Sequence, residues 1–187
     1  EGQDSLLRSS VMQFLERGGR YAEAFNLCDS RFLKDFPNVA HRLASATIGD
    51  NWSSKFLNIP MRAAEYVMKN TEDGSQESIR AALVLAHHHL SNGQREVGWS
   101  MAQTAASHAC AANLHIEQAH ALLVMATLAE FIPDTSAYGS LLDSLNMHEV
   151  PPELRTRLLA RSAQVVLSTP TAATDAYRPL SDAFRTA

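Results

Sequence analysis

The stretch "QESIRAALVLAHHHLSNGQREVGWSMAQTAASHACAA", residues 76–112, decides the fold class of this chain. Apolar residues recur at spacings of three and four on both sides of Gly93, which is the pattern of two amphipathic helices. Glycine readily adopts the left-handed conformation that ends a helix. The stretch therefore predicts two helices, 76–91 and 94–112, whose short connecting turn makes them pack antiparallel as a hairpin.

The whole chain has a composition typical of a helical protein. Its 187 residues are 45% hydrophobic and 19% charged, which is ordinary for a folded globular protein. Alanine occurs 28 times and leucine 22 times, against 14 for isoleucine and valine together. Because alanine and leucine favour helices and β-branched residues favour strands, we predict an all-α protein.

The net charge and the cysteines indicate which classes of partner and which cellular compartment to expect. The net charge of −4 gives no basic footprint, so we expect no direct contact with nucleic acid. No apolar run reaches the roughly 18 residues of a membrane span, so we expect no membrane association. Cys28 and Cys110 lie outside any CxxC motif and indicate reduced thiols in a cytoplasmic protein. The chain begins with Glu1 rather than Met, so we expect residues 1–187 to be one domain of a larger protein.

Glycine and proline separate the amphipathic stretches along the rest of the chain. Ser75 is expected to cap a helix, and Pro60 and Pro152 suit the first turn of a helix, where a missing N–H costs little. The pattern predicts helices at 5–17, 20–34, 37–48, 59–70, 76–91, 94–112, 114–131, 135–146, 152–168 and 172–185.

A small residue recurs early in the second helix of each predicted hairpin. These residues are Ala24, Ala64, Gly98, Gly139 and Ala176, and their spacings are 40, 34, 41 and 37. A small side chain is needed where two helix backbones cross at close range. Five hairpins of this length indicate an α-solenoid, in which similar units stack along one direction.

One family resemblance follows from these units. The segment "GGRYAEAFNLCDSRFLKDFPN", residues 18–38, resembles the second helix of a tetratricopeptide repeat, through Gly19, Tyr21, Ala24 and Pro37-Asn38. Residues 92–106 match less fully, and the tryptophan and Leu-Gly of that family's first helix are missing. The longer units leave a HEAT-like array open as the alternative. The resemblance implies a right-handed α-solenoid of about five antiparallel helical hairpins.

In tetratricopeptide repeats the first helix of each hairpin lines a concave groove that binds a peptide or a partner helix. The resemblance therefore implies a groove built from several hairpins. The implied partner-binding residues are Gln13, Arg17, Arg80, Leu83, His87, His115, Gln118, Arg157 and Arg161. Trp52, in the long link between the second pair of helices, is either a buried plug over the adjacent hairpin or an exposed contact residue.

The three consecutive histidines His87, His88 and His89 do not predict a metal site. Consecutive helical residues point about 100° apart, and two ligands on one helix face need a spacing of three or four. None of the eight histidines has a partner at that spacing. The chain also has no GxSxG, HExxH, P-loop or GxGxxG motif. We therefore expect no metal, no cofactor and no catalysis.

The sequence thus favours a non-catalytic protein–protein interaction module with a protein or peptide partner. The alternative is a regulatory or ligand-sensing helical-repeat domain of a bacterial transcription or signalling regulator, by analogy with such proteins. An enzyme with a site between helices is a third hypothesis. Leu180 and Phe184 leave the last predicted hairpin partly apolar, so we expect that end to be covered by a further segment or by a second copy of the chain, which would form a homodimer through the terminal hairpin.

Overall fold

A computed structural model describes residues 2–49, 52, 58–132 and 134–168, without the side chains of 2–9 and 166–168. The described residues form helices and no strand, so the all-α prediction is confirmed for them. The predicted helix 172–185, and with it the expected dimerisation through the last hairpin, lies outside the described residues. No described helix combines the length and the apolar character that crossing a membrane requires.

The α-helices follow one another along the chain with short connections, and consecutive helices contact each other. Two 3₁₀ turns, η3 (Ala129–Phe131) and η4 (Met147–Glu149), follow α8 and α9. The α-helices are α1 (Gly2–Arg17), α2 (Tyr21–Asn26), α3 (Ser30–Asp35), α4 (Pro37–Ile48), α5 (Met61–Asn70), α6 (Gln76–Ser91), α7 (Arg95–Ala111), α8 (His115–Leu128), α9 (Ser136–Asp143) and α10 (Pro152–Ser168).

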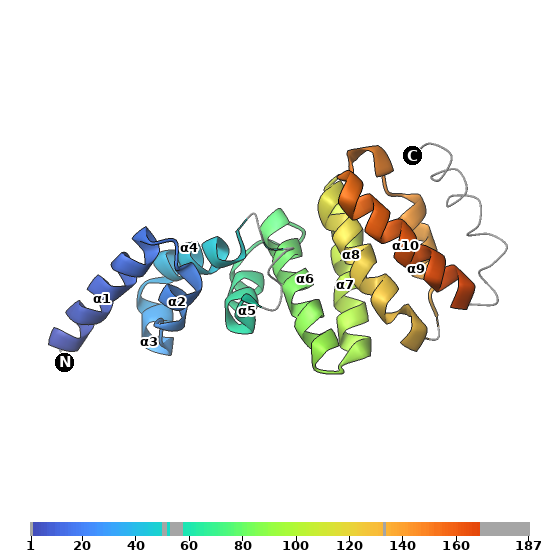
Figure 1. The fold of residues 1–187 in the computed structure, drawn as a ribbon. Coiled ribbons are helices and arrows are strands. Elements are labelled where there is room, and N and C mark those ends of the chain that lie inside the picture. Colours follow the sequence, from blue (N-terminus) through green and yellow to red (C-terminus); the bar gives the residue numbers. More distant parts are fainter. Residues whose placement is uncertain (1, 50–51, 53–57, 133, 169–187) are drawn as a thin grey trace.

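The described helices form an elongated molecule, with α1 at one end and α8, α9 and α10 at the other (Figure 1). Besides its neighbours in the chain, α8 contacts α6 and α10, and α7 contacts α9. The alternate helices α4, α6, α8 and α10 therefore lie against one another in sequence, since α4 also contacts α6. The described second helices α2, α5, α7 and α9 each pack against helices of this row.

Local signals set several helix ends as predicted. Ser75 caps α6, because its side chain accepts a hydrogen bond from the Ser78 N–H at 3.2 Å. Pro152 begins α10, and Gly93 ends the hairpin turn with φ +75°. Only glycine adopts this φ without strain, which explains its position between α6 and α7.

The predicted helix 20–34 is wrong, because it is divided into α2 and α3. Asp29 interrupts it: its carboxylate accepts a hydrogen bond from the Phe32 N–H at 2.8 Å and caps α3. An aspartate that caps a new helix competes with continuation of the old one. The predicted helix 135–146 also ends early, at Asp143, because Asn146 caps the following 3₁₀ turn η4.

Four of the five small residues predicted at helix crossings fall into two groups, and Ala176 lies outside the described residues. Ala24 and Ala64 are fully buried, and a Cβ at Gly98 would lie 3.1 Å from the Ala86 carbonyl oxygen. These three positions fit the close-crossing interpretation. At Gly139 that interpretation is wrong, because a Cβ there would meet nothing within 4 Å.

Candidate functional site

Polar side chains link the first helices of successive hairpins. We call this set the polar row. Its members are Glu16 of α1, Arg42 and Ser45 of α4, Glu77 and Arg80 of α6, and Glu117 of α8. Each contact between helices in the row joins two residues that are at least 26 positions apart in the sequence, so only the fold brings its members together.

The first contact of the row joins α1 to α4. Arg42 donates from Nε to Glu16 Oε1 at 2.9 Å and from an Nη to Glu16 Oε2 at 3.3 Å. Two parallel hydrogen bonds fix the planar guanidinium against the carboxylate. The Arg42 side chain is 61% exposed, so water screens this pair and it contributes little to stability.

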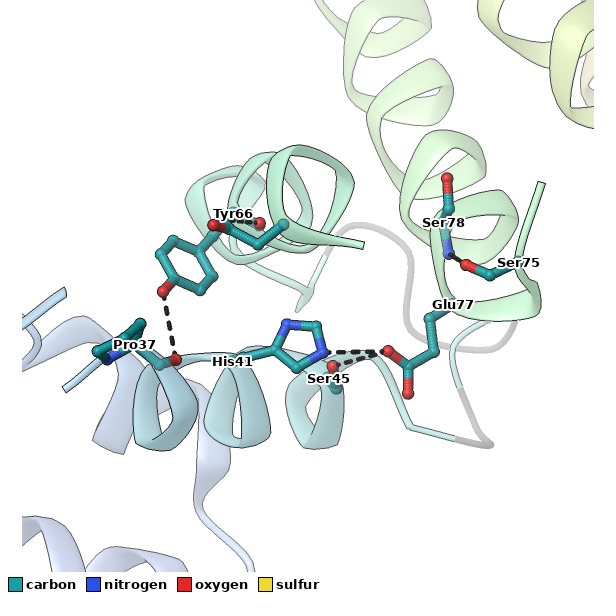
Figure 2. Close-up of polar contacts among 8 residues, drawn as sticks. Pro37, His41, Ser45, Tyr66, Ser75, Glu77 and Ser78 are labelled. Carbon is teal, nitrogen blue, oxygen red and sulfur yellow. Dashed lines mark hydrogen bonds and ion pairs between the residues drawn. The ribbon is translucent and has the colours of Figure 1, made fainter. Parts of the chain in front are cut away.

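The second contact joins α4 to α6 (Figure 2). Ser45 Oγ donates to Glu77 Oε2 at 3.2 Å, and His41 Nε2 lies 3.4 Å from the same oxygen. Glu77 stands in the first turn of α6, where the exposed N–H groups and the helix dipole favour a negative charge. The figure shows His41 and Ser45 on α4 directed toward the Glu77 carboxylate on α6.

A cavity lies beside this second contact. Its volume is about 140 Å³, and it is lined by Ser45, Ile48, Gly49, Glu77 and Arg80. The C-terminal end of α4 forms one wall, and the first turns of α6 form the other. The cavity thus combines a carboxylate, a hydroxyl, an aliphatic side chain and a guanidinium at the junction of two helices.

The third contact joins α6 to α8 and is largely buried. Arg80 Nε donates to Glu117 Oε1 at 2.9 Å, and the Gln76 amide donates to the same oxygen at 2.8 Å. Glu117 is 3% exposed and the Arg80 side chain 20%. A carboxylate so far removed from water requires these two donors, because burying it unpaired would cost several kcal/mol.

Trp52 packs beside this ion pair. Its side chain is 2% exposed, so it is a buried side chain as the plug interpretation predicts. Its ring lies edge-on to the His120 ring with 4.9 Å between centroids, and the Arg80 guanidinium lies 6.0 Å from its centre. Burial lowers the pKa of His120 to about 4; nearby Arg157 adds to this shift and Glu117 opposes it.

Two of the expected partner-binding residues are in the core. Leu83 is fully buried within α6, which contacts α4, α5, α7 and α8. Gln118 is also fully buried, and its amide donates to the Leu141 carbonyl at 2.9 Å and to Ser144 Oγ at 2.8 Å. The expectation that these two side chains face a partner is therefore wrong, because each is enclosed by neighbouring helices.

The other expected residues lie on different parts of the molecule. Gln13 and Arg17 are exposed on α1, whereas Arg157 and Arg161 are exposed on α10 at the opposite end (Figure 1). His115 is mostly buried, with Nε2 3.7 Å from a Glu149 oxygen. Of the nine residues, only Arg80 belongs to the polar row.

The three adjacent histidines diverge. His88 Nε2 lies 2.9 Å from the Ile59 carbonyl oxygen, and His89 Nδ1 contacts the Gln94 side-chain oxygen. His87 is half-buried, and burial, together with the neighbouring His88, lowers its pKa. Within the part of the chain that the structure describes, no three His, Cys, Asp or Glu side chains are grouped so that they could hold a metal ion.

Sequence reasoning missed Ser45, Glu77 and Glu117 as members of a common site. Glu117 carried a signal, because it is the one acidic residue in the apolar helix "HIEQAHALLVMATL", residues 115–128. A lone acid in such a helix is expected to need a partner. Ser45 and Glu77 carried no such signal, since both look like ordinary solvated helix residues.

The chain was compared with protein-family models, with curated proteins and with solved structures, and none of them matches it.

Proposed function

We propose that this protein is a right-handed α-solenoid and a non-catalytic interaction module that binds a protein or peptide partner along the polar row. The observation that carries the proposal is the course of the row. Its members come from α1, α4, α6 and α8, which are the first helices of four successive hairpins. In the tetratricopeptide-like arrangement that residues 18–38 resemble, first helices line the binding groove.

The chemistry of the row favours an extended peptide or a partner helix with charged side chains. Acidic and basic groups alternate along it, and Arg42 and Glu77 are more than half exposed. Such an array supplies specificity and a fast, salt-dependent association more than raw affinity. Ordering a flexible peptide opposes binding, so the affinity is expected to be moderate.

The test is photo-crosslinking in cells from two positions. A photoreactive phenylalanine analogue replaces Arg42 in the row, and the same analogue replaces Thr104, an exposed residue of α7. Loss of the exposed Arg42–Glu16 pair is expected to change stability by less than about 1 kcal/mol, and circular dichroism checks that the fold is kept.

If the partner binds along the polar row, we expect one discrete crosslinked protein from position 42 and none from position 104. Competition by excess unlabelled chain shows that the product reflects a saturable site. The same products from both positions, or no product from position 42, would contradict binding along the row.

The regulatory or ligand-sensing alternative rests on resemblance alone and stays a second hypothesis. The cavity of about 140 Å³ beside the row is smaller than the roughly 300–1,000 Å³ of drug-sized ligand pockets. The reduced cysteines inferred from the sequence lead us to propose a cytoplasmic location for the interaction.

A further inference from the structure

The cavity between α4 and α6 has the size and chemistry of a pocket for one side chain. Its volume of about 140 Å³ exceeds the roughly 30 Å³ that one water molecule takes up in the liquid. It is too small for most free ligands or cofactors. A planar guanidinium or an ammonium group with part of its methylene stem is of suitable size.

The described part of the cavity wall presents one carboxylate, that of Glu77. Arg80 is offset by the buried Glu117, whose Oε1 accepts its Nε–H at 2.9 Å. With histidine counted as neutral at pH 7, the remaining charge among the lining and contacting residues is the carboxylate of Glu77. Among the described residues, a hydroxyl and an imidazole contact this half-exposed carboxylate, which favours a positively charged guest.

The geometry of Glu77 leaves room for that guest. Ser45 and His41 both contact Oε2, and within the described part of the chain no hydrogen bond involves Oε1. The Glu77 side chain is 53% exposed, so a group from outside can reach it. Oε1 is therefore available to accept a charge-assisted hydrogen bond.

The cavity wall formed by α4 also favours a cation. Ile48 and Gly49 stand at the C-terminal end of this helix, where carbonyl groups lack N–H partners within the helix. The helix dipole places a partial negative charge there, which favours a cation. Ile48 is 5% exposed and contributes the aliphatic part of the cavity lining, on which a methylene stem can end.

We propose that this cavity is a specificity pocket for a lysine or arginine side chain of the partner that docks on the polar row. The inference rests on the proposed function, because the basic side chain is taken to belong to that partner. The guest's cationic head pairs with Glu77 Oε1 and points toward the end of α4, and its stem lies against Ile48.

The test uses the full chain and three small probes of similar size whose head groups are cationic, neutral or anionic. n-Butylguanidinium is titrated at constant ionic strength while amide resonances are followed by ¹⁵N NMR, with butyrate as the anionic probe and N-butylurea as the neutral one. With n-butylguanidinium we expect saturable shifts of the amide resonances of Ser45, Ile48, Gly49 and Glu77, with a Kd of roughly millimolar order. Butyrate and N-butylurea are expected to shift none of these resonances.

The variant Glu77→Gln keeps the oxygen that accepts the Ser45 hydrogen bond but removes the charge. It is expected to weaken n-butylguanidinium binding about tenfold. Glu72→Gln, an exposed loop residue before α6, makes the same change in net charge and is expected to leave binding unchanged. Equal weakening by both variants, or equal binding of butyrate at the same amides, would overturn the pocket.

The two proposals fail separately. Crosslinking from position 42 together with no cation binding would retain the interaction surface and refute the pocket. Cation binding that depends on Glu77, without any crosslinked partner, would retain a cation site and refute its assignment to a partner's side chain.

Discussion

At the scale of single residues, the buried polar groups between α6 and α8 have the largest energetic consequences. Glu117 accepts hydrogen bonds from Arg80 and Gln76. His120, three positions later, is 8% exposed and lies against Trp52. The Glu117 carboxylate thus has two hydrogen-bond donors, whereas burial favours the neutral form of the His120 ring.

The state of His120 predicts a pH dependence of stability. Its folded-state pKa of about 4 lies below the ordinary histidine value of 6.5, so between these values the unfolded chain binds a proton that the folded protein does not. The free energy of unfolding is therefore expected to fall as pH drops from 6.5 toward 4, by on the order of 2 kcal/mol from this residue.

Urea unfolding at pH 7 and at pH 4.5 measures this effect. His120→Leu removes the titrating group and is expected to lose less stability between the two pH values than the parent protein. His148→Gln changes an exposed histidine and serves as the control. If all three proteins lost the same stability, burial of His120 would not be the cause.

At the scale of elements, backbone contact decides how closely the helices pack. Gly98 brings α7 against α6, with Ala86 O 3.1 Å and Leu90 N 3.5 Å from the site of a Cβ. Gly139 in α9 has no such neighbour. Glycine therefore permits a close helix crossing at position 98, whereas no close crossing requires it at position 139.

This difference predicts opposite effects of substitution. Gly98→Leu is expected to destabilise the protein by roughly 2–3 kcal/mol or more, because the backbone of α6 has to move. Gly139→Ala is expected to stabilise it by about 0.5–1 kcal/mol through the higher helix propensity of alanine. Thermal and urea unfolding measure both values, and an unchanged stability of Gly98→Leu would show that the crossing is not tight.

At the scale of the whole molecule, burial is unevenly distributed. The central helices α6, α7 and α8 contact helices on several sides, whereas α1 packs mainly on α2. Phe14 of α1 is 71% exposed and Val11 is 41% exposed. In an elongated array of helices, each element depends chiefly on its neighbours, so stability is expected to vary along the chain.

Native-state hydrogen exchange is expected to reflect this gradient. Amides in the middle of α6, α7 and α8 should exchange most slowly, near the rate set by global unfolding, and those in α1 should exchange fastest among the helices. Uniform protection from α1 to α10 would show instead that the helices unfold as one cooperative unit.

The sequence by itself determined the helical class and most helix ends. The bounds 37–48, 76–91 and 152–168 agree with α4, α6 and α10, because caps, prolines and helical periodicity act within a few residues. The break that Asp29 makes in the predicted helix 20–34 is also a local effect, because its side chain accepts a hydrogen bond from the N–H three residues later and caps α3. The apolar pattern continues through this position, so the pattern alone predicted one unbroken helix.

The tertiary structure alone decided which polar groups meet and which expected surface residues are buried. Gln76 and Glu117 are 41 positions apart, and the burial of Leu83 and Gln118 depends on helices from other hairpins. Helical periodicity states which residues share a face, but it does not state what packs against that face. The polar row and its cavity therefore arise from contacts between helices that are distant in the sequence. The energies of such contacts cannot be read from a local pattern of residues.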